Sequence, residues 1–213
     1  LIDVWAHRTA ELSAIEEVKA VFPFENRGEE IGVTLHHPHG QIYSYPFVPP
    51  RTAAIARSAQ AHREQHGTEL FDDIIAAEQR AAGRVIEDSE HFLVFTPAAA
   101  KWPLEVMVMS KRAVPDFAAL SDEEKDDLAG ICHRLFAAVD HFFEGVDRTP
   151  YIAAWNQAPV DTPADGRFHL QLFSLMRSPN RMKFLAGSES GMGVWINDTI
   201  PETIAATVKE HYA

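Results

Sequence analysis

The chain has 213 residues and a formal net charge of −12 at pH 7, with Cys132 as its single cysteine. This acidic balance argues against non-specific nucleic-acid binding, which depends on basic surface. One cysteine excludes an intrachain disulfide and fits a reducing compartment. No apolar run approaches the length of a membrane span, and no secretory leader is visible. We therefore expect a cytoplasmic protein that binds neither nucleic acid nor membranes and meets any anionic substrate with local donors.

The first residues repeat apolar side chains at three- and four-residue steps, which predicts a helix over residues 1–19. The chain has no initiator methionine and no capping residue before this helix, so we interpret it as the C-terminal portion of a longer protein. Residues 51–82 are helical in composition, with a break expected at Gly67. Short strands are predicted over residues 20–24, 31–35 and 41–45.

A second set of elements follows in the C-terminal part of the chain. Ser121 and Glu124 form a capping-box pattern at the start of a long helix, and a last helix is predicted over residues 198–211. This order of strands and helices favours an α+β fold with antiparallel sheets backed by helices. Strands are predicted over residues 85–86, 92–95, 105–109, 151–155 and 169–173.

The order of predicted strands and helices shows a weak internal repeat, which suggests that the chain contains two similar halves. Residues 1–50 are interpreted as the C-terminal part of a first, incomplete half, and residues 84–213 as a complete second half. Residues 51–83 are predicted to form a helical connector between them.

The turn at residues 36–41 (HHPHGQ) is the strongest candidate for chemistry. Pro38 restricts its own backbone and that of the residue before it, while Gly40 allows close approach of a ligand. A neutral imidazole can attack phosphorus when one ring nitrogen carries a lone pair and the other donates its proton to an acceptor, often a backbone carbonyl. This turn therefore predicts a nucleophilic histidine, although histidine-rich turns also occur as surface loops.

Several separated motifs, in this order and spacing, resemble galactose-1-phosphate uridylyltransferases, a transferase branch of the histidine-triad superfamily. The resemblance runs from Leu1 to the C-terminus and implies two histidine-triad-like halves. It also implies UDP-glucose and galactose 1-phosphate as substrates, with the uridylyl group carried on a histidine between glucose 1-phosphate and galactose 1-phosphate. The motifs are residues 24–28 (FENRG), 32–34 (GVT), 36–41 (HHPHGQ), 155–159 (WNQAP), 168–173 (FHLQLF) and 181–189 (RMKFLAGSE).

The resemblance makes His39 the nucleophile and Gln41 a hydrogen-bond donor to the phosphoryl oxygens. An amide at position 41 offers no labile proton, which favours transfer between phosphates over hydrolysis. In the family, the loop around residues 183–189 reaches the active site of a partner subunit, so a homodimer is implied. The other substrate contacts implied are Asn26, Gly32, Val33, Thr34, Lys183, Phe184, Ser188 and Glu189. A surface ion pair is the alternative for Lys183 and Glu189.

The resemblance also concerns two metal sites of the family, of which the sequence keeps a ligand of the first and replaces two ligands of the second. His37 matches a zinc ligand of many members, and the other ligands of this structural zinc are expected upstream of Leu1. The second metal site of some members is expected to be absent, because Asn156 and Gln171 stand at two of its histidine positions and only His169 is kept. We expect Asn156 and Gln171 to form a hydrogen-bonded cluster instead.

Two other functions stay open. Ser188 replaces a tyrosine of the family pattern, and a further glutamine is replaced near Trp195, so a nucleotide-sugar or dinucleotide phosphorylase of the same superfamily is an alternative. The other alternative is an inactive fragment that acts only in dimerisation.

Overall fold

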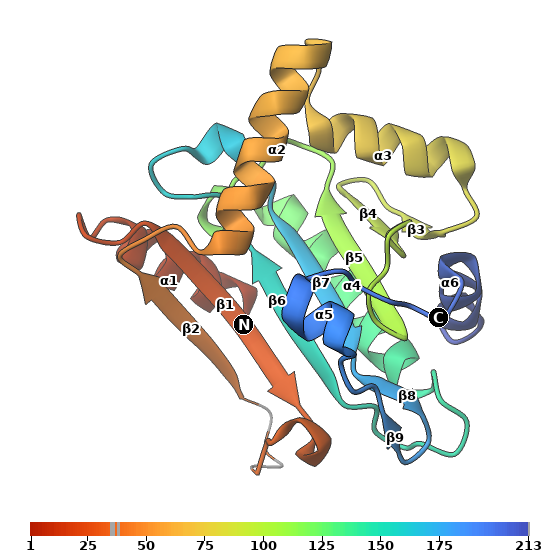
Figure 1. The fold of residues 1–213 in the computed structure, drawn as a ribbon. Helices are drawn as coiled ribbons and strands as arrows, with labels where there is room; N and C mark the ends of the chain where they lie inside the picture. The colour runs from red at the N-terminus through yellow and green to blue at the C-terminus, as the bar shows by residue number, and fades with distance from the viewer. Residues whose placement is uncertain (35–36, 38, 213) are drawn as a thin grey trace.

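The computed structural model describes residues 1–34, 37 and 39–212. Within these residues, seven strands form one sheet in the order β2-β1-β6-β7-β5-β4-β3, and every neighbouring pair is antiparallel (Figure 1). The strands are β1 Ala20–Arg27, β2 Gly40–Tyr45, β3 Val85–Asp88, β4 Phe92–Phe95, β5 Leu104–Ser110, β6 Tyr151–Asn156 and β7 His169–Ser174. A small ribbon of β8 Met176–Ser178 and β9 Arg181–Met182 lies apart from this sheet. The predicted α+β class is confirmed.

Helices cover both faces of the sheet because its central strands are apolar on both sides. Val106 and Leu172 join a core with α1, α4 and α6, while Met109 and Phe95 join a second cluster with α2 and α3. The helices are α1 Ile2–Ser13, α2 Pro50–His66, α3 Leu70–Ala81, α4 Asp122–Asp140, α5 Gly187–Met192 and α6 Pro201–Glu210. Short 3-10 turns lie at Glu29–Ile31, Phe117–Ala119 and Pro163–Asp165. No helix of the described chain is both long and apolar enough to span a bilayer.

Two local predictions are confirmed in detail. The Ser121 hydroxyl accepts a hydrogen bond from the Glu124 backbone N–H at 3.2 Å, and the Glu124 carboxylate accepts one from the Ser121 N–H at 2.8 Å. These paired bonds satisfy two of the donors that a helix start leaves open. Gly67 ends α2 with φ of 71°, in the left-handed conformation that favours glycine.

The strand predicted over residues 31–35 is wrong for the described part of that segment. Residues 29–31 form a 3-10 turn, and Gly32 follows it with φ of 86°, which no strand accommodates. Leu35 lies outside the described residues. The first helix also ends at Ser13 rather than at residue 19.

The strands on either side of the histidine turn are part of the main sheet. β1 pairs with β6 through Phe24 and Ala154, so residues 20–45 extend the sheet of the C-terminal part without a break. This pairing brings the end of β1 beside the beginning of β6, where Arg27 pairs with Tyr151, although more than a hundred residues separate the two in the chain. The predicted connector, residues 51–83, forms α2 and α3 across the opposite end of the sheet (Figure 1).

Candidate active site

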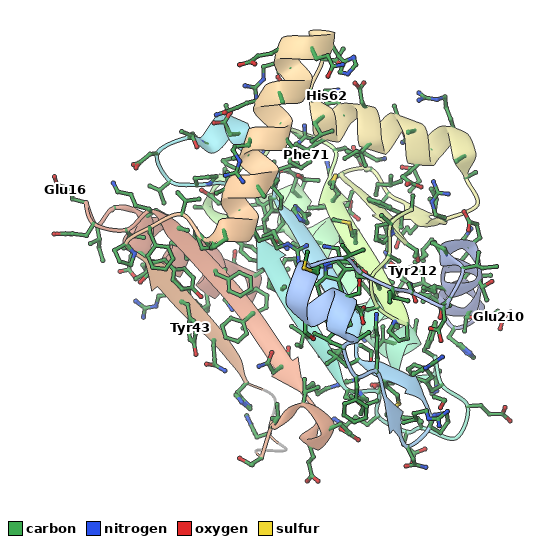
Figure 2. The ribbon with its side chains drawn as sticks, viewed as in Figure 1. Glu16, Tyr43, His62, Phe71, Glu210 and Tyr212 are labelled. Carbon is green, nitrogen blue, oxygen red and sulfur yellow. The ribbon has the colours of Figure 1, made fainter. Side chains whose placement is uncertain are left out.

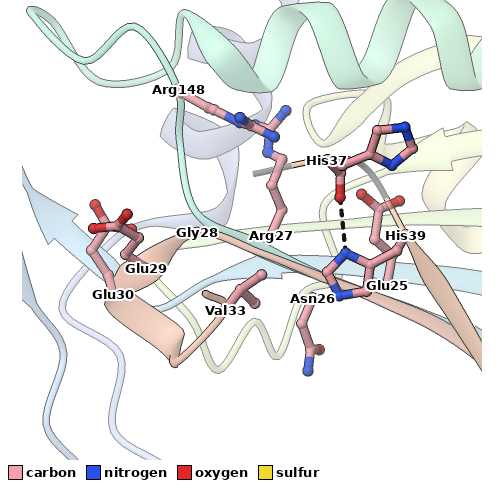
Figure 3. Close-up of a pocket in the computed structure, with 10 residues that line it drawn as sticks. All are labelled: Glu25, Asn26, Arg27, Gly28, Glu29, Glu30, Val33, His37, His39 and Arg148. Atoms are coloured by element: carbon pink, nitrogen blue, oxygen red, sulfur yellow. Dashed lines mark hydrogen bonds between the residues drawn. The ribbon is translucent and has the colours of Figure 1, made fainter. Parts of the chain in front are cut away.

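A pocket of about 190 Å³ lies where β1 ends and the chain turns toward β2. Its floor comes from the end of β1 and the 3-10 turn, residues 25–30. His37 and His39 form its opposite side, and Arg148 reaches it from the loop between α4 and β6 (Figure 3). The register of the sheet explains this placement, because Glu25 is paired with Gly40, next to His39.

The His39 ring is held in one tautomer. Its Nδ1 lies 2.9 Å from the backbone carbonyl oxygen of His37 (Figure 3). A carbonyl can only accept, so Nδ1 carries the proton and Nε2 keeps its lone pair. This is the state that nucleophilic attack on phosphorus requires.

A polar network supports the strand beneath His39. The Tyr151 hydroxyl donates to the Glu25 carboxylate at 3.2 Å, and the Arg27 guanidinium lies 4.1 Å from the centre of the Tyr151 ring. Arg27 also pairs with Asp140 and donates to the Thr149 carbonyl oxygen. Burial raises the pKa of Glu25, whereas the Tyr151 hydrogen bond and the positive charge of Arg27 lower it. Glu25 lines the same pocket as His39, so its carboxylate would favour a positive charge on the His39 ring.

Gln41 is oriented by a neighbour on its own strand. The Tyr43 hydroxyl donates to Gln41 Oε1 at 3.1 Å. The two residues are two positions apart on β2 and thus share a face of the sheet. Because this bond uses the carbonyl end of the amide, the amide N–H₂ group is left as the donor end.

Among the other predicted contacts, only some lie at this pocket. Asn26 and Val33 line it. Gly32 and Thr34 belong to the same short loop as Val33, and the Thr34 side chain is exposed. Glu25 and Arg148 line the pocket but were not predicted as site residues. The FENRG motif contains Glu25 and could have indicated it, whereas Arg148 belongs to no motif.

The second predicted group of contacts lies in a separate pocket of about 250 Å³ that includes Lys183, Phe184 and Glu189. Lys183 Nζ lies 2.8 Å from a Glu189 carboxylate oxygen, with side-chain exposures of 11% and 2%. The pair is thus buried rather than a surface ion pair. Lys183 also donates to the carbonyl oxygens of Lys101 and Ile196. The hydrogen bond from Lys183 to the Glu189 carboxylate is the main cause that lowers the pKa of Glu189 to about 2.

This ion pair fixes the shape of the loop that follows β9. Glu189 accepts hydrogen bonds from the backbone N–H groups of Ala186 and Ile196 at 2.9 and 3.1 Å. Ser188 donates to the Val194 carbonyl oxygen at 3.3 Å. Phe184, in contrast, is 88% exposed and projects from the loop. The residues that line this pocket and those that line the His39 pocket do not overlap.

Comparison with known proteins agrees with this arrangement. The family model of the galactose-1-phosphate uridyl transferase C-terminal domain matches residues 56–212, and that of the N-terminal domain matches residues 1–49. The chain belongs to the galactose-1-phosphate uridylyltransferase family. It is 46% identical to the enzyme of that name from Streptomyces lividans over 160 residues, which is 75% of this chain and 45% of the relative. It is 33% identical to that from Thermotoga maritima over 214 residues, 99% of this chain and 66% of the relative.

A solved uridylyltransferase structure has the same fold. It superimposes with a TM-score of 0.91 at 32% identity, over 99% of this chain and 66% of that chain. The chain spans roughly half to two thirds of the length of these curated relatives. Family membership therefore covers the whole of the chain but only part of its relatives.

The residues at the family's second metal site are each engaged elsewhere. His169 Nδ1 lies 2.7 Å from the Arg167 carbonyl oxygen, Gln171 donates to Glu105, and Asn156 donates to the Ala154 carbonyl oxygen at 3.0 Å. The predicted cluster of Asn156 with Gln171 is wrong, because each amide bonds to a different partner. No group of three His, Cys, Asp or Glu among the described residues could hold a metal ion. Two amides and one imidazole are a poor ligand set for the metal of the family's second site. That this site is absent from the protein stays a prediction.

His169 should make stability depend on pH. Burial lowers its pKa from 6.5 to about 4, so the unfolded chain binds a proton between these values that the folded chain rejects. Its contribution to stability is complete above pH 6.5 and is lost as pH falls toward 4, by at most about 1.4 kcal/mol per pH unit. Urea unfolding measures the free energy of unfolding of wild type and His169→Gln across this pH range. This free energy should change less steeply with pH in the variant than in the wild type. Equal slopes would contradict the assignment.

Proposed function

We propose that the protein transfers a uridylyl group from UDP-glucose to galactose 1-phosphate through a covalent intermediate on His39. The observation that carries this proposal is the bond from His39 Nδ1 to the His37 carbonyl oxygen, which leaves Nε2 as a nucleophile. Membership of the family and the presence of the His-Pro-His-Gly-Gln turn support the same chemistry.

The reaction has two in-line steps. His39 Nε2 attacks the α-phosphorus of UDP-glucose, a phosphorus–nitrogen bond forms, and the bond to the bridging oxygen breaks as glucose 1-phosphate leaves. A phosphate oxygen of galactose 1-phosphate then attacks the same phosphorus and releases Nε2. The ring carries a positive charge in the intermediate, which the His37 carbonyl and the nearby Glu25 charge stabilise.

The proposal is tested by incubating the purified protein with UDP-glucose alone. Peptide mass spectrometry should find a uridylyl group on the peptide that contains His39, and none on the same peptide of His39→Ala. A modified peptide in that variant, or none in the wild type, would refute the nucleophile. Comparing galactose 1-phosphate with inorganic phosphate as acceptor then separates a transferase from a phosphorylase.

Arg148 is expected to contribute binding of the anionic substrate. It brings positive charge from the second half of the chain to a pocket that also contains Glu25, Glu29 and Glu30. Arg148→Gln should lower kcat/KM by about tenfold to a hundredfold, because a charge-assisted contact to phosphate is removed. Steady-state kinetics measure this change. Arg57→Gln on the exposed side of α2 serves as the matched control, and an equal loss there would point to a general charge effect.

The remaining proposals concern the assembly and its surroundings. We propose a homodimer, because the pocket of Lys183 and Glu189 and the pocket of His39 share no lining residue in one chain. Sedimentation of the purified protein tests it. We also propose that His37 is a zinc ligand, which needs further ligands beyond the described residues, since none of these forms a metal-binding group with it. The protein is proposed to act in the cytoplasm, without nucleic-acid or membrane partners.

A further inference from the structure

Another cavity, of about 510 Å³, lies between the sheet and the helices α2 and α3. Figure 1 shows these helices crossing the end of the sheet that is remote from the histidine turn. No lining residue is shared with the His39 pocket. The cavity is therefore separate from the site proposed for the transfer reaction. Its apolar wall includes Ile55, Leu70, Ile74, Phe95, Met107 and Met109.

Two cations stand together at one end of this cavity. Arg51 and Lys101 both line it, and within the described chain neither side chain makes an ion pair or a hydrogen bond. Lys101 Nζ lies 5.2 Å from the centre of the Trp195 ring. Arg51 stands in the first turn of α2, which contains no acidic residue, so the helix dipole adds to the positive potential.

The carboxylates near these cations are already engaged. Glu105 accepts from the backbone N–H groups of Lys101 and Trp102, at 2.6 and 3.3 Å, and from the Gln171 amide. Glu78, at the α3 side of the cavity, is paired with Arg84 at 3.0 Å. The cavity end therefore keeps one positive charge in excess. Burial lowers the pKa of Lys101 and the Arg51 charge lowers it further, while the Glu105 charge opposes this shift only in part.

Polar atoms on the sheet beneath the cations also lack partners. Gln171 is 2% exposed, and its Oε1 has no hydrogen-bond partner among the described residues. It is paired across the sheet with Met107, a residue of the cavity wall, so both side chains share that face. His169, which lines the cavity, donates from Nδ1 to the Arg167 carbonyl oxygen, so Nε2 of the neutral ring is an acceptor. Unpaired buried polar atoms of this kind are costly.

We propose that this cavity binds a small amphipathic anion, with an oxyanion head held by Arg51 and Lys101 and an apolar chain between α2, α3 and the sheet. The excess positive charge at Arg51 and Lys101 attracts the anionic head. The unpaired acceptors on the sheet, Gln171 Oε1 and His169 Nε2, can each accept a hydrogen bond from a hydroxyl group of the ligand. A purely polar anion would leave the apolar wall in water, and a neutral chain would leave the cations unpaired.

Isothermal titration calorimetry with sodium decanoate tests the proposal on the wild-type protein. Decanoate should bind in a one-to-one complex, whereas decanol and butyrate should each bind at least about tenfold more weakly, because each lacks one half of the recognition. Equal affinity for decanoate and decanol, or no heat of binding at millimolar decanoate, would overturn the proposal. These comparisons need no variant.

Variants then locate the bound anion. Arg51→Gln and Lys101→Gln should each weaken decanoate binding by about tenfold, and Ala54→Phe should abolish it by filling the cavity from α2. Arg57→Gln, on the same helix, is the matched control and should bind as the wild type does. Circular dichroism establishes that each variant is folded. Unchanged binding in folded Arg51→Gln and Lys101→Gln would show that the head lies elsewhere.

Discussion

Replacing His39 with glutamine should lower uridylyl exchange by about 10⁴-fold or more, because it removes the imidazole nitrogen that we propose forms the phosphorus–nitrogen bond. Glutamine keeps a polar side chain of similar length but has no nitrogen lone pair available for attack. The rate of isotope exchange between UDP-glucose and glucose 1-phosphate measures this loss directly, since it needs only the first step. Substrate binding, followed by calorimetry, should change far less than the rate.

A matched substitution keeps this result interpretable. His7 is an exposed histidine on α1, and His7→Gln should leave the exchange rate unchanged. Residual exchange in His39→Gln within tenfold of the wild type would contradict a covalent intermediate on this residue.

Most of the secondary structure could be predicted because it depends on local periodicity. The capping box at Ser121 and the glycine end of α2 are set by residues within one turn, and both are found where the sequence indicates them. The strand prediction for residues 31–34 was wrong for a local reason as well. Apolar residues alternate there, but Gly32 adopts a positive φ that ends the 3-10 turn, and the pattern alone does not reveal this.

The histidine turn could be predicted, but its surroundings could not. Glu25 and Tyr151 meet only because β1 pairs with β6, a contact between residues 126 positions apart. Lys183 donates to the carbonyl oxygens of Ile196, in its own loop, and of Lys101, which lies 82 residues earlier in the chain. Such contacts depend on tertiary structure, so a single sequence indicates which residues carry the chemistry but not what holds them.

The pair of Gln41 and Tyr43 gives the second large effect. Gln41→Ala should lower kcat by about 10²–10³-fold if, as we propose, the Gln41 amide donates to the phosphoryl oxygens, where charge develops in the transition state. Tyr43→Phe removes only the hydrogen bond that fixes the Gln41 amide, and should lower kcat by about three- to tenfold. Tyr45→Phe, on the same strand, is the control.

The double variant decides whether Tyr43 acts through Gln41. If the Tyr43 hydroxyl serves only to turn the amide N–H₂ group toward the substrate, then Gln41→Ala with Tyr43→Phe should be no slower than Gln41→Ala alone. If the fold losses in kcat of the two single variants multiply in the double variant, the Tyr43 hydroxyl contacts the substrate independently. That result would refute the positioning role. The orientation of the Gln41 amide can depend on the Tyr43 hydrogen bond because of the geometry of a β-strand. Residues two apart on β2 share a face, so Tyr43 can hold the Gln41 amide without any other part of the fold.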